Sequence, residues 1–440
     1  MRKHKGDFSI IVLMLILMAI GLLVMYTIGP VRANFLNAAL GEKQYYEAYF
    51  FVHQLISVGL SLLVFFLFAK FKLFKYQNLQ KWSTWLLLIS FFMCALVAIG
   101  LVANVPFAKC ELGGCRWLKL GPISLQPAEF VKFSLILYLA SIFTKYRGKG
   151  AKGITIGETT IGKGFGKTNV LHNVDFLWRF LLSVGVSLLF VVVLQKDLGS
   201  GVPIAVITLF MIFQSGTPWR ELILIAAAVF VLGVGAIMTS PHRRERLWTY
   251  LGMGETSETT EEEEDADAYH IENALIAIGT GGLFGVGIGN SVQATGYLPE
   301  SINDSVFAIM GETFGFIKLV GVLILFACLL MRILKVADYS NDNANSMIAI
   351  GAFAWVMTQV VVNVMAMTKI IPLTGITLPL LSYGGTSMMA IAGILGVVYQ
   401  LSQYTSREVV TDEQRKKEIA ASHESMRRVE YEQFNYRRRR

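Results

Sequence analysis

Long apolar stretches recur along almost the whole chain, and they decide which solvent it can fold in. A helix that crosses the hydrocarbon core of a bilayer, about 30 Å thick, needs roughly 20 mostly apolar residues. The stretches that meet this requirement lie near residues 8–28, 50–69, 84–105, 127–145, 177–194, 198–215, 221–239, 305–332, 345–367 and 386–404. With 54% hydrophobic and only 16% charged residues, the chain does not have the composition of an ordinary soluble globular protein. The sequence therefore predicts an all-α polytopic membrane protein with about ten transmembrane helices.

Lysine and arginine residues gather in alternate connections between these stretches. They occur among the first five residues, in the connections 70–81, 145–167 and 332–335, and in the tail that ends at Arg440. Because loops rich in Lys and Arg stay in the cytoplasm, we expect this face and both termini to be cytoplasmic. Topology and contact with anionic lipid then explain the net charge of +8, and no recognition motif accompanies it that would indicate nucleic-acid binding.

The predicted organisation is one membrane domain, residues 1–405, followed by a charged cytoplasmic tail, residues 406–440. The longest outer connection, residues 241–304, is an extracytoplasmic loop between predicted helices 7 and 8. It contains the acidic run 261–265 and ends at Asp304. Since binding and catalytic residues are often carried by loops on a rigid scaffold, we expect function there.

Two further features of the outer connections concern the backbone. Cys110 and Cys115 share one predicted outer loop, where an oxidising compartment would permit a disulfide, and the sequence leaves open whether it forms. The segment 279–289 is rich in glycine but lacks both the dinucleotide-binding spacing and a strand-helix-strand unit around it. It predicts a re-entrant or tightly packed segment in which backbones approach closely.

Asp304 opens the eighth apolar stretch. A carboxylate at the mouth of a membrane-spanning segment is costly to desolvate, so its presence needs a reason. Either Asp304 caps a helix or it takes part in chemistry, and one residue can do both.

Other polar residues lie near the predicted outer side. Glu129 and Lys132 are three residues apart and project from the same side of a helix, although Glu129 also fits ordinary helix-start chemistry. Asp197 is expected to cap the sixth helix. Residues 368–387 are apolar but broken by Pro and Gly, and such backbone is tolerated in a membrane only where it is buried or lines a cavity. Together these segments predict an outward-facing polar cavity.

Five motifs, in order along the chain, resemble those of the SEDS family (shape, elongation, division and sporulation). They are Arg116-Trp117 with Gln126-Pro127-Ala128-Glu129, residues 194–200 (LQKDLGS), residues 278–285 (IGTGGLFG), Tyr297-Leu298-Pro299-Glu300, and residues 381–387 (LSYGGTS). The resemblance implies a peptidoglycan glycosyltransferase of the bacterial cytoplasmic membrane that polymerises lipid II at the outer face. It also implies a class B penicillin-binding protein and division-machinery proteins as partners.

The family's catalytic aspartate lies four residues past the Glu of the Tyr-Leu-Pro-Glu motif, which here is Asp304. A lone carboxylate fits this chemistry, because pyrophosphate leaves without a general acid and only a base for the incoming sugar 4-hydroxyl is missing. The leaving pyrophosphate needs positive charge, from basic side chains alone or with a divalent cation such as Mg²⁺ or Mn²⁺, whose ligands the sequence does not assign. The candidate substrate-binding residues are Arg116, Glu129, Lys132, Asp197, Arg243, Arg246, Glu300, Lys369 and Ser382.

Within the family, Gly311-Glu312 and the approach to Ser382 resemble the division members (FtsW) more than the elongation members (RodA) or the sporulation members (SpoVE). The chain departs from the family pattern at Lys196, at residues 301–303, and at His270 and Asn273, where glutamines are usual. Two other functions stay open, a transporter that flips lipid II across the membrane and a scaffold for the division machinery.

Overall fold

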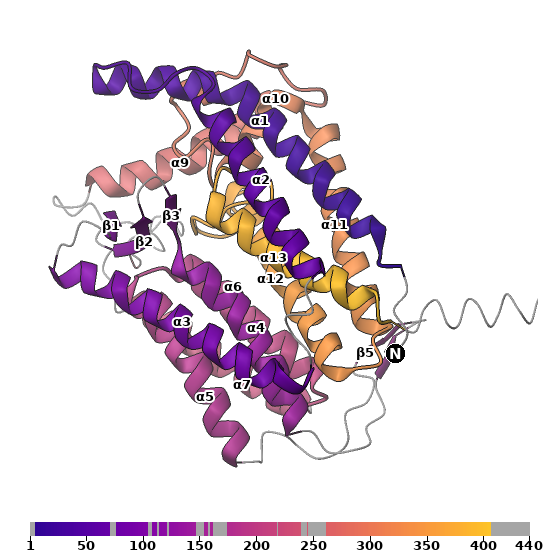
Figure 1. Ribbon diagram of the computed structural model, residues 1–440. Helices are drawn as coiled ribbons and strands as arrows, with labels where there is room; N and C mark the ends of the chain where they lie inside the picture. Colours follow the sequence, from indigo (N-terminus) through magenta and orange to yellow (C-terminus); the bar gives the residue numbers. More distant parts are fainter. Residues whose placement is uncertain are drawn as a thin grey trace, which may run out of the picture.

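The computed structural model is a helical bundle with a small sheet at one end (Figure 1). It describes residues 5–70, 76–103, 108–111, 114–120, 123–146, 154–156, 159–161, 174–217, 219–238, 244 and 261–405. The helices are α1 (Phe8–Leu40), α2 (Tyr49–Lys70), α3 (Tyr76–Ala103), α4 (Pro127–Lys145), α5 (Val174–Leu188), α6 (Leu198–Gln214), α7 (Trp219–Met238), α9 (Glu261–Thr280), α10 (Val306–Phe314), α11 (Phe316–Asp338), α12 (Asn343–Met367) and α13 (Gly385–Ser402). The predicted tail, residues 406–440, lies outside the described residues.

Eight helices in the described part of the chain are long and apolar enough to cross a membrane. They are α1, α2, α3, α4, α5 with its continuation to Leu194, α11, α12 and α13, while α6 is apolar but shorter. Each of the ten predicted stretches contains helix, but the count of ten spans stays a prediction. Within their most apolar windows, 89% of α4 and 72% of α12 are buried against only 22% of the α5 segment. The first two therefore form the centre of the bundle, and α5 turns most of its surface outward.

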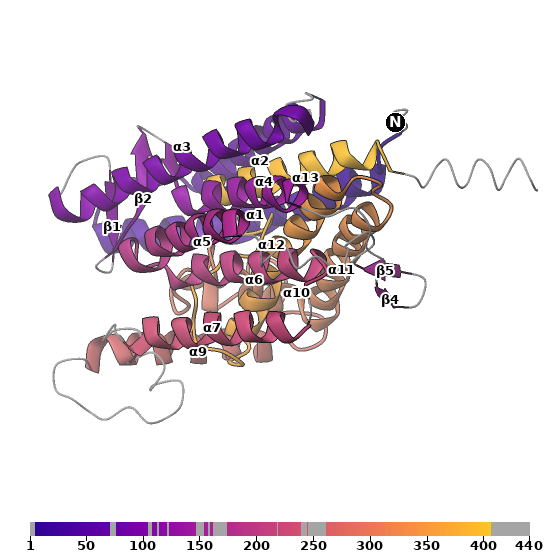
Figure 2. The same cartoon turned by 90° about the horizontal axis from the view of Figure 1, so that it is seen from below.

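The two ends of the bundle differ in what they carry. In both views the sheet of β1 (Ala108–Glu111), β2 (Gly114–Leu120) and β3 (Ile123–Leu125) lies toward the same end as α9 (Figures 1 and 2). The N-terminus and the hairpin of β4 (Ile154–Ile156) and β5 (Thr159–Ile161) lie at the opposite end. This separation agrees with the sides that the basic residues predict for these segments.

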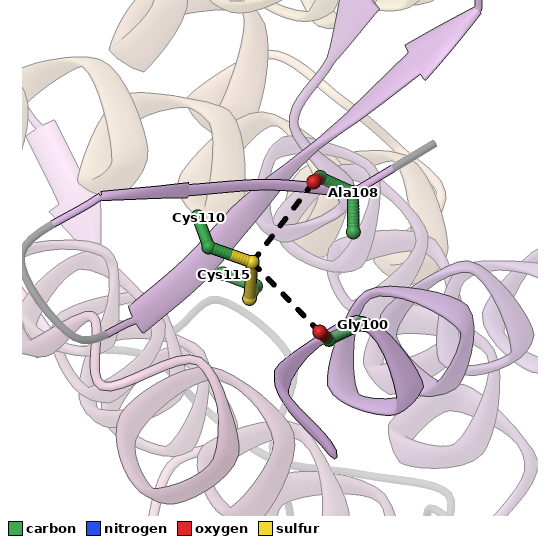
Figure 3. The surroundings of a disulfide bond; sticks show 4 residues. All are labelled: Gly100, Ala108, Cys110 and Cys115. Atoms are coloured by element: carbon green, nitrogen blue, oxygen red, sulfur yellow. Dashed lines mark hydrogen bonds between the residues drawn. A yellow bond between two sulfur atoms is a disulfide. The ribbon is translucent and has the colours of Figure 1, made fainter. Parts of the chain in front are cut away.

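The three-stranded antiparallel sheet, in the order β1-β2-β3, is a departure from the predicted all-α fold. Cys110 and Cys115 face each other in the β1–β2 register and form a disulfide (Figure 3). The Sγ of Cys110 lies 4.0 Å from the carbonyl oxygen of Gly100 near the end of α3 (Figure 3). A hydroxyl of Thr386, in the first turn of α13, donates to the carbonyl of Ser124 in β3, 2.7 Å away. The sheet is thus fixed to both α3 and α13.

The prediction of a single span over 305–332 is wrong, because the helix breaks at Gly315. Residue 315 has a φ of 82°, and a side chain there would lie 2.2 Å from the backbone nitrogen of Gly285. The amide of Val286 donates to the carbonyl of Glu312 at 2.9 Å, so two backbone segments cross directly. Within the mostly exposed segment 279–289, Gly281 and Gly285 therefore approach the backbone of residues 311–315 closely, as predicted, and only glycine allows this approach.

The connection between α7 and α11 is also more ordered than a loop. It contains α9, a short 3-10 helix, η3 (Gln293–Thr295), and α10. The acidic run 261–265 begins α9, and the apolar residues of the second half of α9 include the buried Ala274 and Ala277. Burial of this face explains a helix where the sequence indicated only a polar connection.

Asp7 joins three helices at the end of the bundle that carries the N-terminus. Its carboxylate accepts from the Arg332 guanidinium of α11 at 2.6 Å and caps α1 by accepting from the Ser9 amide at 3.1 Å. Its own amide donates to the hydroxyl of Ser402, the last residue of α13, at 2.9 Å. The first and last helices of the described chain are therefore connected to each other and to α11.

Candidate active site

Asp304 lies at the end of a tight turn that runs from Glu300 to Ser305. Glu300 has a φ of 49°, and its carbonyl accepts from the amides of Asn303 at 2.9 Å and Ser305 at 3.2 Å. Asp304 is only 9% exposed. Of the two alternatives for Asp304, capping is not met at the N-cap itself, because Ser305 occupies the N-cap of α10.

Two parts of the chain that are distant in sequence hold the turn. The side-chain amide of Asn363, on α12, donates to the carbonyls of both Asp304 and Ile376, each at 2.7 Å. The amide of Tyr383 donates to the carbonyl of Ile302 at 2.8 Å. Because Asn363 is 1% exposed, this double contact is shielded from water. The backbone of Asp304 is thereby fixed to α12 and to the broken segment 368–384.

Ser382 has a structural partner inside that broken segment. Its hydroxyl oxygen accepts from the amide of Leu378 at 2.9 Å, and its amide donates to the Leu378 carbonyl at 3.1 Å. The side-chain amide of Gln54, on α2, donates to the Ser382 carbonyl at 3.3 Å. Ser382 thus closes a turn beside the Asp304 segment, where the sequence indicated a substrate contact.

A buried ion pair lies on α4. The ammonium of Lys132 and the carboxylate of Glu129 are 2.7 Å apart, and their side chains are 1% and 5% exposed. The Lys132 ammonium also lies 5.3 Å from the ring centroid of Trp355 on α12, which is a cation–π distance. The structure thus joins the acid and base that sequence spacing put on one side of a helix.

A chain of polar contacts leads from α4 to the sheet. The side-chain amide of Gln126 donates to Asp197 at 3.2 Å, and the other oxygen of Asp197 accepts from the Ser200 amide at 3.0 Å. Asp197 therefore caps α6, as predicted. The guanidinium of Arg116, in β2, donates to the carbonyl of Lys196 at 3.1 Å, which places it next to this cap.

Helix α12 connects the two polar groups. Trp355 and Asn363 are eight residues apart, or about 12 Å along the helix axis. Between them Gln359 is 2% exposed, and its side-chain oxygen has no hydrogen-bond partner within the described residues. One carboxylate oxygen of Glu129 also has no hydrogen-bond partner within the described residues. Since buried acceptors of this kind are normally met by water or a ligand, these atoms mark where a polar group would bind.

The remaining predicted site residues are more scattered. Glu300 is exposed and accepts from the side-chain amide of Asn303. Lys369 is exposed just after the end of α12. Arg243 and Arg246 lie outside the described residues.

Sequence reasoning missed two residues that contact the Asp304 turn, Asn363 and His270. Asn363 carried a usable signal, because a lone amide inside an apolar stretch is costly without a partner. His270, 8% exposed on α9, stood out in the sequence only as a departure from the family pattern, because the helix that carries it was not predicted.

Within the described residues, no three His, Cys, Asp or Glu side chains gather closely enough to hold a metal ion. The described residues therefore do not fit a cation held by the protein alone. A divalent cation that accompanies the substrate's pyrophosphate stays a prediction.

Residues 7–407 match the family model of the FtsW, RodA and SpoVE cell cycle proteins. The chain belongs to this family. The FtsW/RodA/SpoVE match covers all five motifs from which the sequence indicated a SEDS protein, so that resemblance is confirmed.

Relatives of the family agree in length as well as in sequence. The chain is 30% identical to stage V sporulation protein E of Bacillus subtilis over 92% of its own length and 99% of that protein. It is 31% identical to the probable peptidoglycan glycosyltransferase FtsW of Coxiella burnetii, over 91% and 96% of the two chains.

Solved structures show the same fold in the FtsW/RodA/SpoVE family. A chain of a peptidoglycan synthase complex that coordinates polymerisation and crosslinking aligns with a TM-score of 0.64 at 24% identity, over 90% of this chain and 98% of that one. RodA of Thermus thermophilus aligns with a TM-score of 0.59 at 24% identity, over 90% and 97%. The predicted helical membrane fold is therefore confirmed, and the chain is a multi-pass membrane protein.

Proposed function

We propose that the chain is a peptidoglycan glycosyltransferase that polymerises lipid II, with Asp304 as the general base. The names of the FtsW relatives support the reaction class. The observation that carries the proposal is the fixed, buried position of Asp304, whose backbone is held by Asn363.

The reaction needs one proton acceptor and one anion site. The 4-hydroxyl of one sugar attacks the anomeric carbon of another, and its proton passes to the Asp304 carboxylate. The bond between that carbon and the pyrophosphate oxygen breaks as the new glycosidic bond forms. The lipid pyrophosphate then leaves with its negative charge, which nearby cations stabilise.

The basic side chains among the described residues differ in whether they already have a partner. Lys132 is already paired with Glu129, and Arg116 already donates to a backbone carbonyl. A bound pyrophosphate would have to compete with these partners, so we assign Lys132 and Arg116 to the walls of the site. Arg243, Arg246 and the exposed Lys369 are the proposed pyrophosphate contacts.

We place the reaction at the outer face of the bacterial cytoplasmic membrane, with both termini in the cytoplasm. The disulfide at the sheet end supports this orientation, because such bonds persist in oxidising compartments. The resemblance in fold to a chain of a peptidoglycan synthase complex supports a class B penicillin-binding protein as the partner. The FtsW names among the relatives favour a role in division, for which depletion in the native bacterium should give filaments rather than rounded cells.

The proposal is tested with purified protein and lipid II. We expect the wild type to form glycan chains and Asp304→Asn, which keeps the shape but removes the base, to lose at least a hundredfold in rate. Glu42→Gln serves as the control, because Glu42 is an exposed carboxylate outside the motifs and the contacts described above.

Two outcomes would contradict the proposal. Chain growth by Asp304→Asn at the wild-type rate would remove Asp304 as the base. Transfer of lipid II across a vesicle bilayer without any chain growth would instead indicate the transporter. The division role would fail if depleted cells became round.

A further inference from the structure

His270 contacts the residue that follows the proposed base. It lies on α9, and its Nε2 atom is 2.6 Å from the hydroxyl oxygen of Ser305. Ser305 is the N-cap residue of α10 and the direct neighbour of Asp304. Both side chains of this contact are buried, at 8% and 0% exposure.

A count of protons fixes the direction of this hydrogen bond. The Ser305 hydroxyl carries one hydrogen and donates it to the carbonyl of Pro299, 2.9 Å away, which can only accept. The Ser305 oxygen can therefore only accept from His270, so Nε2 must carry a proton. The neutral form of His270 protonated only at Nδ1 does not fit this arrangement.

The contact fixes the Asp304 turn at a second point, in addition to the bond from Asn363. The hydrogen bond from the Ser305 hydroxyl to the Pro299 carbonyl joins the two ends of the turn, and His270 donates to the same Ser305 oxygen. Helix α12 holds the middle of the turn through the Asp304 carbonyl. His270 comes from the connection that precedes the turn in the sequence, and Asn363 comes from a helix that follows it.

We propose that His270 is a positioning residue for Asp304, which donates from Nε2 to Ser305 and so holds the turn in the geometry that general-base catalysis needs. The inference rests on the proposed function, because it assigns a role in the same reaction. It requires a donor at this position and not a charge. Glutamine presents a side-chain N–H donor as well, whereas alanine presents none.

The test compares His270→Gln with His270→Ala in lipid II polymerisation. We expect the alanine variant to lose ten- to hundredfold in kcat with KM changed less than threefold, and the glutamine variant to stay within about threefold of wild type. The double variant His270→Ala with Ser305→Ala should lose no more than the worse single variant, because both act through one bond. Asn273→Ala is the matched control, since its side chain is equally buried on α9 but donates within the helix to Tyr269.

Hydrogen exchange gives a readout that does not need activity. We expect faster amide exchange over residues 299–305 in His270→Ala but not in His270→Gln. Full activity of the alanine variant, loss of activity in a folded glutamine variant, additive losses in the double variant, or an equal loss in Asn273→Ala would each overturn the inference. If the wild type forms no glycan but the two variants differ in exchange as expected, the proposed function is contradicted and the positioning contact is supported.

Discussion

Asn363 makes two buried hydrogen bonds, one to the carbonyl of Asp304 and one to the carbonyl of Ile376. Both use the same amide nitrogen, and both acceptors are backbone carbonyls. An aspartate in its place would put a third acceptor against these oxygens. The choice of an amide is therefore determined by the need for a donor in an environment without water.

We expect Asn363→Asp to be worse than Asn363→Ala in both stability and polymerisation. The alanine variant removes a donor from two buried carbonyls, at a cost of about 1–3 kcal/mol each, and the aspartate adds repulsion or an uptake of a proton. Thermal unfolding in detergent and the rate of glycan synthesis measure the two effects. Asn290→Asp is the control, because Asn290 makes one such bond at an exposed site. Equal behaviour of the two Asn363 variants would contradict the donor requirement.

The ion pair of Glu129 and Lys132 is a second case in which one residue depends on another. Removing one charge from a buried pair leaves the other uncompensated and typically costs about 3–5 kcal/mol, whereas removing both costs much less. We expect Lys132→Met to lower the unfolding midpoint strongly and Glu129→Gln with Lys132→Met to recover most of the loss. If recovery of stability also restores polymerisation, the pair is structural. Additive destabilisation in the double variant would show that the two side chains act independently.

Among the elements, the crossing of the 279–289 segment with the α10–α11 junction controls where helix can form. Gly315→Ala would force a side chain against Gly285 in a left-handed conformation, so we expect a loss of about 2 kcal/mol or more. Gly321→Ala is a matched control inside α11, where an added Cβ meets nothing within 4 Å. That variant should be neutral or stabilised by up to about 1 kcal/mol. Thermal unfolding of both variants makes the comparison, and similar midpoints would argue against the crossing.

The apolar stretches predicted most elements because length and composition alone decide whether a helix can lie in lipid. The break at Gly315 could not be predicted, since a single glycine in an apolar run is compatible with a continuous helix. Its cause is contact with Gly285, thirty residues earlier in the chain. Helix α9 was missed for a related reason, because its acidic start resembles a solvated loop and its buried face is short.

The candidate site was predictable only in part. Asp304 and most of the candidate substrate-binding residues were assigned from motifs and stay predictions, whereas helical spacing predicted the Glu129–Lys132 contact that the structure shows. The contacts that hold the Asp304 turn come from Asn363 and His270, which are separated from it by tens of residues. No local pattern encodes such pairs, because they depend on how the helices pack.

At the scale of the whole molecule, the two ends of the bundle should face different compartments. Cys110 and Cys115 should react with a membrane-impermeant maleimide in intact cells only after reduction, since they form a disulfide at the sheet end. A cysteine introduced as Asn341→Cys, at the exposed turn between α11 and α12, should react only after the membrane is permeabilised. Both measurements use a background with Cys94 and Cys328 replaced by alanine. Labelling of residue 341 in intact cells would contradict the predicted orientation.

The contact of Asp7 with Arg332 and Ser402 spans 395 residues and brings the start of α1 next to the end of α13. The two ends of the membrane domain therefore lie side by side. A short linker between them would allow the chain to be circularly permuted, with new ends opened in a connection elsewhere. In the permuted chain the helices would be synthesised in a different order, but the Asp304 turn would keep its neighbours. Such a chain would separate the requirements of the finished fold from the requirements of insertion into the membrane.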